Sequence, residues 1–291
     1  MPEGDTIFRA ARTLRSAIGG AEVTDIATTV PQVLRLGPRR LVGQRVAEVE
    51  SRGKHLLIWF APSDLALHSH MRMTGSWHVY GQGEPWHKPQ AFAKVVLRFA
   101  GVVAVCFSAP VVALLSRSQV ERHPALSALG PDALDPDADL AEARRRLDER
   151  RGWTIGEALL DQRVLAGVGN VYKSEVCFLH IIDPWTPVGL IDAHTRDAVL
   201  ATAARLLRSN ATRTSPMRVT TAAIGPGRQR LHVYGRARRP CPRCATPIRA
   251  ARQGQPPRLT YWCPRCQGPG PDAAANHRAD RSSDLEPYPR P

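Results

Sequence analysis

Two cysteine pairs near the C-terminus constrain the fold of this chain more than any other feature. Cys241 and Cys244 form one Cys-Pro-Arg-Cys segment, and Cys263 and Cys266 form another after 18 intervening residues. Each pair can place two thiolates on one side of a metal, and two pairs complete a tetrahedral site with no open position. The spacing predicts one structural Zn²⁺ with a two-stranded hairpin between the pairs. A redox role for the pairs is the alternative.

The positive charge is concentrated in the C-terminal quarter. The formal net charge is +14, and the stretch between Asp197 and Asp272 has 14 arginines and no acidic residue. The rest of the chain balances its charges, with 26 basic and 26 acidic residues. A solvated surface explains such a stretch poorly, so we predict that it binds a polyanion, most readily a nucleic acid.

Length and composition indicate a globular protein of two domains with adequate cores, with one large domain as the alternative. The chain has 291 residues, 43% of them hydrophobic, and no apolar run approaches the ~20 residues of a membrane helix. Charges at Glu3, Asp5 and Arg9 interrupt any signal-peptide core. We expect a soluble cytoplasmic monomer with no membrane partner, nucleoid-associated if bacterial. Cys106 and Cys177 lie in apolar runs and are expected to be buried free thiols.

The N-terminal part predicts a β-sandwich with a flanking helix over residues 1–123, in a multi-domain α+β protein. Apolar positions spaced as on one face of a helix cover 6–18 and end at two glycines. Short β-rich runs separated by turn residues follow. The expected strands are 45–49, 56–60, 65–68, 95–99, 102–107 and 111–115.

The remainder predicts a helical domain and a small metal module. The Pro/Asp-rich segment 124–139 is expected to be a linker, 140–236 a helical DNA-binding domain, 237–267 the zinc module, and 268–291 a disordered tail. Thr154 and Glu157 have the spacing of a capping box. The expected helices are 140–150, 154–165, 170–179 and 192–209, and the expected hairpin strands are 246–252 and 258–262.

The first residues offer a candidate nucleophile. A small second residue such as Pro2 usually allows removal of Met1, which leaves a secondary amine at the new N-terminus. An α-amino group titrates near pH ~8 and can attack a carbonyl-like carbon to form an iminium. Glu3 could shuttle a proton beside it. Met-Pro-Glu opens many chains, so these residues alone leave an ordinary N-terminus as the alternative.

Five segments together resemble the formamidopyrimidine-DNA glycosylase/endonuclease VIII family of base-excision repair enzymes, over about residues 1–267. The PEGDT start is similar to the endonuclease VIII branch, which differs here from the PELPE of the formamidopyrimidine branch. The remaining segments are the RGK hairpin at 52–56, the helix-two-turn-helix signature at 165–172, the segment Val233-Tyr234-Gly235-Arg236, and Arg258 before the second cysteine pair.

The resemblance implies a bifunctional glycosylase/AP lyase that acts on damaged DNA. Pro2 would attack C1′ of the damaged nucleotide, with Glu3 as the proton donor and Lys54 assisting beside the phosphate. Arg258 and Asn170 would hold the DNA backbone near the flipped nucleotide. The iminium would then permit strand cleavage by β- and δ-elimination. Without the family, Lys54 would be an ordinary hairpin lysine and Asn170 a helix cap alone.

Residues that would fill the void left by the flipped base fall on Arg72, Met73 and Thr74. Met73 is a plausible apolar wedge, with core packing as the alternative. The endonuclease VIII pattern has Gln-Leu-Tyr here, so contacts to the opposite base are expected to differ. A DNA-binding arginine of some members falls on Ala128. Asp161 and Glu175 are expected on flanking helices, either as structural residues or as supports for the residues that contact DNA.

The sequence thus predicts a glycosylase for oxidised bases, pyrimidines favoured over purines. A formamidopyrimidine or 8-oxoguanine glycosylase of the same family is one alternative. A zinc-dependent protein that binds damaged or abasic DNA without catalysis is the other. Pro2, Glu3 and Lys54 argue against that second alternative, because binding alone requires none of them.

Overall fold

The computed structural model describes residues 2–215, 217–221 and 230–271. These residues separate into two compact units, each drawn from several parts of the chain. The first unit comprises Met1–Ala143, Asp161–Gly169 and Ala204–Met217, and the second comprises Arg144–Leu160, Asn170–Ala203 and Arg218–Pro291. The units interleave in sequence. The domain boundaries that the sequence predicts stay a prediction. No helix among the described residues combines the length and apolarity needed to span a membrane.

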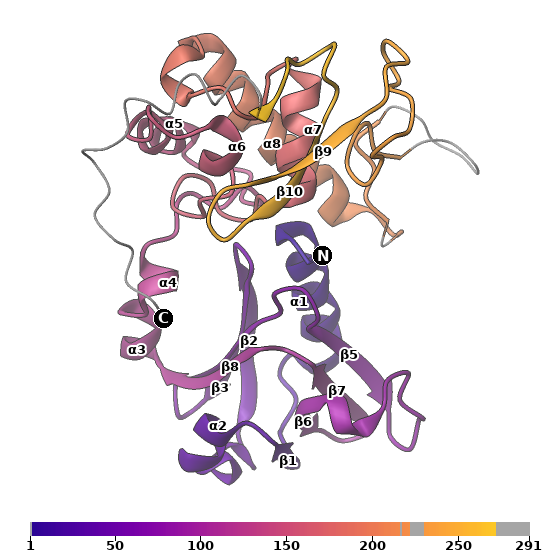
Figure 1. Ribbon diagram of the computed structural model, residues 1–291. Helices are drawn as coiled ribbons and strands as arrows, with labels where there is room; N and C mark the ends of the chain where they lie inside the picture. The colour runs from indigo at the N-terminus through magenta and orange to yellow at the C-terminus, as the bar shows by residue number, and fades with distance from the viewer. Residues whose placement is uncertain (1, 216, 222–229, 272–291) are drawn as a thin grey trace. The chain divides into compact units, whose positions relative to one another are not determined.

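Two four-stranded antiparallel sheets form the first unit, as the predicted β-sandwich requires (Figure 1). One sheet has the order β2–β3–β4–β8 and the other β1–β6–β7–β5. The strands of the first sheet are β2 (Arg45–Arg52), β3 (His55–Ala61), β4 (Leu65–His70) and β8 (Val111–Ser116), and those of the second are β1 (Asp25–Thr28), β5 (Ser76–Gly81), β6 (Ala93–Arg98) and β7 (Val102–Phe107).

The main core of this unit lies between the sheets and helix α1 (Gly4–Ile18). Strand β3 contributes side chains to two hydrophobic clusters, because successive side chains of a strand point to opposite faces of the sheet. Ile58 and Phe60 face the main core, whereas Leu57 and Trp59 pack in a second cluster on the other side. Short helices complete the unit: α2 (Pro31–Arg35), α3 (Arg117–Glu121), α4 (Pro124–Ser127) and the 3₁₀ turns Pro38–Leu41 and Gln90–Phe92.

The predicted helix over 154–165 is wrong in extent. Helix α6 covers only Ile155–Ala158, although Thr154 caps it through a 3.4 Å hydrogen bond from the Glu157 amide, as predicted. The following residues exchange backbone hydrogen bonds with 130–133 instead of continuing the helix. Gly130 N–H donates to the Gln162 carbonyl at 2.9 Å, and Ala166 N–H donates to the Pro131 carbonyl at 2.9 Å. The segment expected to be a linker is therefore ordered against this loop.

The second unit combines helices with the cysteine module. Its helix α7 (Asn170–Leu179) has the predicted bounds, and helix α8 (Ala193–Thr212) begins in this unit and ends in the first. Helix α5 (Leu140–Asp148) begins in the first unit and ends in this one. The remaining elements are the 3₁₀ turn Val188–Leu190 and the antiparallel hairpin of β9 (Arg249–Gln253) and β10 (Arg258–Trp262). Most of the tail predicted to be disordered lies outside the described residues.

Both cysteines outside the module are buried, as predicted. Cys106 lies in β7 and Cys177 in α7, and neither is exposed to solvent. Burial raises the pKa of each thiol to about 12, so both are protonated and unreactive at neutral pH.

Candidate active site and metal centre

Backbone close approaches fix the N-terminus of the first unit. Pro2 is half-buried and Glu3 is fully buried at the start of α1. The Gly4 amide donates to the Gly167 carbonyl at 2.9 Å. A Cβ on Gly169 would stand 2.2 Å from the Glu3 carboxyl carbon. The glycines of the 161–169 loop therefore make room for the Glu3 side chain beside Pro2.

Gln162 holds this loop in place. Its amide oxygen accepts a 3.0 Å hydrogen bond from the Gly167 N–H, and its amide nitrogen donates to the Val168 carbonyl at 2.9 Å. Gly167 has a φ of +95°, a conformation that favours glycine. Sequence reasoning missed Gln162, because nothing local links it to the N-terminus.

The Lys54 turn rests on the same loop. Lys54 is half-buried in the turn between β2 and β3, after Gly53 with a φ of +57°. A Cβ on Gly53 would stand 3.1 Å from the Ala166 Cβ. The Gly53 N–H donates to the Asp132 carboxylate at 2.7 Å. The 166–169 segment thus contacts both the N-terminal residues and the lysine turn within one unit.

Asp132 is a second residue that sequence reasoning missed. Its other carboxylate oxygen accepts a 3.0 Å hydrogen bond from the Leu134 N–H. Burial raises the pKa of Asp132, while the two amide hydrogen bonds, from Gly53 and Leu134, act against that rise. A cavity of about 430 Å³ adjoins the turn, and its lining includes Phe8, Gly53 and Asp132.

The predicted void-filling residues lie on an exposed turn after β4. Met73 is 54% exposed, which excludes core packing for this side chain. Arg72 has a φ of +44°, and its N–H donates to Nδ1 of His70 at 3.2 Å. The Thr74 hydroxyl donates to the Ser108 carbonyl at 3.0 Å. These two hydrogen bonds fix the residues on either side of Met73, whose side chain is exposed.

Asn170 and Arg258 belong to the second unit. Asn170 is the first residue of α7 and only 4% exposed, and its amide nitrogen donates to the Leu259 carbonyl at 2.7 Å. Arg258 is exposed at the start of β10. The amide predicted to contact DNA therefore contacts the hairpin that carries Arg258, and its role toward DNA stays a prediction.

Four cysteine sulfurs converge in the second unit. The Sγ atoms of Cys241, Cys244, Cys263 and Cys266 all lie within 4.8 Å of one another. Across the two pairs, the Sγ atoms of Cys244 and Cys263 lie 3.4 Å apart and those of Cys241 and Cys266 lie 3.9 Å apart. Convergence of all four thiols, rather than of one pair, fits a tetrahedral metal site and disfavours the redox reading.

The flanking acids have structural partners. Glu175 is fully buried and accepts hydrogen bonds from the amides of Val233 at 2.9 Å and Tyr234 at 2.8 Å. It thereby fixes the segment that precedes the first cysteine pair. Asp161 pairs with Arg163 at 2.8 Å, and Ala128 ends helix α4.

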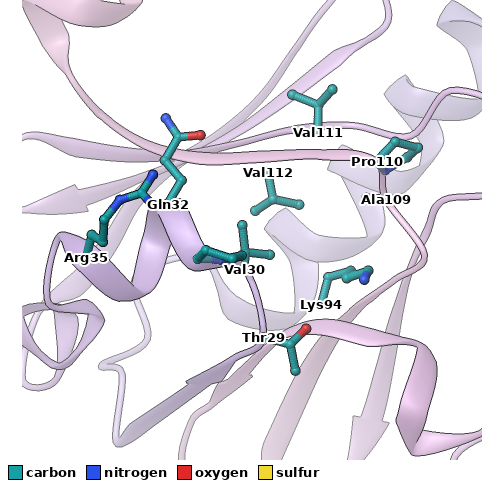
Figure 2. Close-up of a pocket in the computed structure, with 10 residues that line it drawn as sticks. Thr29, Val30, Gln32, Arg35, Lys94, Ala109, Pro110, Val111 and Val112 are labelled. Atoms are coloured by element: carbon teal, nitrogen blue, oxygen red, sulfur yellow. The ribbon is translucent and has the colours of Figure 1, made fainter.

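A separate cavity of about 570 Å³ contains none of the predicted site residues. It lies among α2, β6 and β8, and Figure 2 shows Val30, Val112 and Lys94 around it. We therefore do not include this cavity in the candidate site.

Comparison with known proteins agrees with this arrangement. Residues 1–110 match the formamidopyrimidine-DNA glycosylase N-terminal domain, and residues 129–220 match the helix-two-turn-helix domain of the same enzymes. The chain is 45% identical over 275 residues to "Probable endonuclease 8 2" of Streptomyces coelicolor, covering 93% of this chain and 96% of that protein.

The chain belongs to the formamidopyrimidine-DNA glycosylase/endonuclease VIII family. Its class is therefore that of DNA-repair glycosylases with AP lyase activity. Another family member, "DNA-(apurinic or apyrimidinic site) lyase Nei2" of Mycolicibacterium smegmatis, is 39% identical and covers 92% of this chain and 99% of its own. Among solved family structures, the Lactococcus lactis enzyme in complex with abasic-site DNA has a TM-score of 0.77 at 25% identity, covering 91% of this chain and 99% of that one.

Proposed function

We propose that this protein removes oxidised bases from DNA, pyrimidines in preference to purines, and then cleaves the strand. The observation that carries the proposal is that one loop segment contacts both the N-terminal residues and the turn that contains Lys54. The 166–169 segment meets Glu3 and Gly4 on one side and Gly53 on the other. Pro2, Glu3 and Lys54 are the residues that such a reaction needs.

The reaction begins once Met1 has been removed. The neutral Pro2 nitrogen attacks C1′ of a flipped nucleotide, and the bond from C1′ to the base breaks. The base leaves with the electron pair of that bond and takes up the proton that the Pro2 nitrogen releases. Glu3 supplies a proton to the sugar ring oxygen as the ring opens, which leaves an iminium between Pro2 and C1′. The iminium draws electrons from C2′, so loss of a C2′ proton expels the 3′ phosphate. A second elimination then releases the 5′ phosphate.

The second unit supplies the grip on DNA in this proposal. Arg258 and Asn170 hold the phosphates beside the lesion, since a guanidinium can bind a phosphate through two hydrogen bonds. The turn of Arg72, Met73 and Thr74 fills the void, with Met73 as the apolar wedge. One Zn²⁺ held by the four cysteines would stabilise the hairpin that carries Arg258. We propose a cytoplasmic monomer as the acting form.

Pyrimidine preference rests on the PEGDT start and on the similarity to proteins named endonuclease 8. A solved structure of the Lactococcus lactis enzyme holds Fapy-dG-containing DNA, which keeps a formamidopyrimidine substrate, with 8-oxoguanine as the other oxidised purine, as the second candidate. Incision of duplexes that carry thymine glycol, 8-oxoguanine or an abasic site separates the two. Faster release of thymine glycol supports the first proposal, and faster release of 8-oxoguanine supports the second. Binding without incision of any duplex would contradict both.

A further inference from the structure

A buried lysine lies at the contact between α7 and the zinc hairpin. Lys173 is fully buried, and its ammonium donates to the Thr260 hydroxyl at 2.5 Å. The chain has only four lysines, and an apolar residue would fill such a place without the desolvation cost of an ammonium. The charge therefore indicates a role beyond packing.

A one-way chain of hydrogen bonds starts at this ammonium. The Thr260 hydroxyl donates to the Gln253 amide oxygen at 2.8 Å, and the Gln253 amide nitrogen donates to the Thr154 hydroxyl at 2.9 Å. The Thr154 hydroxyl in turn donates to the Glu157 carboxylate at 2.5 Å. Every donor points from the cation toward the anion, so each bond polarises the next.

The surroundings are shaped to this chain of bonds. A Cβ on Gly156 would stand 2.4 Å from the Gln253 amide oxygen, so only glycine leaves room for that amide. The Gln253 amide nitrogen also donates to the Pro184 carbonyl at 2.8 Å. One residue of β9 is therefore tied to α6 and to the loop after α7.

The chain of bonds passes next to Arg258 at Gln253, before it reaches Glu157. In the hairpin register Gln253 of β9 pairs with Arg258 of β10. Asn170 and Lys173, three positions apart on one face of α7, bond to the consecutive residues Leu259 and Thr260. The two residues that follow Arg258 in the strand are thus fixed to α7, while Arg258 itself is exposed.

We propose that Lys173 is a positioning residue that acts through Thr260 and Gln253 to hold Arg258 in its DNA-binding pose. This proposal rests on the proposed contact of Arg258 with DNA phosphates. Loss of the ammonium leaves the metal and the hairpin in place, but lets the strand that carries Arg258 move against α7. The contribution of Arg258 to DNA affinity then falls.

A double-mutant cycle in the full-length zinc protein tests this. The variants are Lys173→Met, Arg258→Ala and the double mutant, and the measurement is the Kd for a duplex with a tetrahydrofuran abasic analogue. We expect Lys173→Met to weaken binding roughly tenfold alone, as the loss of a charged hydrogen bond does. In the Arg258→Ala background the same change should have little further effect, because coupled residues are not additive.

A matched pair of variants at Thr260 distinguishes loss of the hydrogen bond from a folding defect. Thr260→Val keeps the shape without the hydroxyl and should reproduce Lys173→Met, whereas Thr260→Ser keeps the hydroxyl and should bind like the wild type. Zinc content and Tm are measured for each variant. Wild-type affinity in Lys173→Met and Thr260→Val, or full additivity with Arg258→Ala, overturns the proposal. Wild-type affinity in Arg258→Ala overturns it together with the proposed role of Arg258, while covalent trapping at Pro2 would still support the proposed catalysis.

Discussion

The carboxyl carbon of Glu3 lies 2.2 Å from the place that a Cβ on Gly169 would take. Two segments distant in sequence therefore fit together only if residue 169 is glycine. Glu3 is fully buried, so its side chain has little freedom to move aside. The geometry makes Gly169 a requirement for the position of the proposed acid rather than a simple loop residue.

Substitution Gly169→Ala is expected to displace the Glu3 carboxyl group. A misplacement of about 1 Å in a catalytic group can cost roughly 100-fold in rate, so single-turnover incision of the preferred lesion should fall by about that factor. Gly152→Ala is the matched control, because a Cβ there meets nothing within 4 Å. Wild-type incision by Gly169→Ala would show that the position of Glu3 does not limit the chemistry.

Asp132 is expected to hold the Lys54 turn through the Gly53 amide. Substitution Asp132→Ala leaves that amide and the amide of Leu134 without their acceptor, which should lower the free energy of unfolding by about 1–3 kcal/mol. Incision should fall with it, because the turn that carries Lys54 loosens. Urea unfolding and single-turnover incision measure the two effects.

The exposed carboxylate of Asp137 provides the control for this change. Asp137→Ala should leave both stability and incision near the wild type, since surface substitutions usually change stability by less than about 0.5 kcal/mol. Equal behaviour of the Asp132 and Asp137 variants would contradict the anchoring role.

The sequence anticipates elements that local patterns define and misses those that distant contacts define. Helix α7 has the predicted bounds because a glycine pair precedes it and an apolar face continues through it. The helix predicted over 154–165 ends at Ala158 because its later residues bond to 130–133 instead. Strand β1 is only four residues long, and β5 mixes polar and aromatic residues, so neither gave a clear pattern.

The candidate site divides in the same way. Chemistry or spacing allowed some site residues to be predicted from the sequence, namely Pro2, Lys54 and the cysteines. Gln162 and Asp132 could not be predicted, since each acts on backbone groups that only the fold brings near. For Met73 the exposure in the fold excludes the alternative of core packing that the sequence left open.

Metal removal is expected to act on the hairpin first. Structural Zn²⁺ contributes roughly 10–16 kcal/mol in small modules of this kind, so Cys244→Ser should lose the metal and weaken DNA binding while the sandwich of the first unit stays folded. Cys106→Ala removes a buried thiol outside the module and should retain one zinc per chain. Metal analysis and Kd for abasic DNA check both. A Cys244→Ser protein with full zinc content and affinity would contradict the four-cysteine site.

A cluster of histidines, two buried and one half-buried, predicts acid sensitivity of the first unit. Burial, followed by the positive charge of neighbours that include Lys54 and His123, lowers the pKa of His55 from 6.5 to about 2. Burial and the neighbouring charges also lower the pKa of His68 and of His70 from 6.5 to about 4. All three stay neutral in the fold where the unfolded chain takes up protons.

The free energy of unfolding falls as the pH falls, because the unfolded state binds more protons on these histidines than the folded state does. Above pH 6.5 both states are neutral and the histidines contribute no pH dependence. Below pH 6.5 the free energy of unfolding falls by about 1.4 kcal/mol per pH unit for each histidine, until the pH reaches its folded pKa. Denaturant unfolding from pH 7 to 4 should show a shallower fall for His68→Leu than for the wild type. The exposed control His194→Ala should follow the wild type, and identical slopes for all three proteins would refute the assignment.

The most direct measurement of the central claim is borohydride trapping on an abasic-site duplex, followed by peptide mapping of the adduct. The expected result is one covalent adduct on the Pro2 nitrogen, formed only by protein whose intact mass shows that Met1 has been removed. Protein that retains Met1 should bind the duplex without being trapped. An adduct mapped to Lys54, trapping by the Met1-retaining form, or binding without any adduct would contradict Pro2 as the nucleophile.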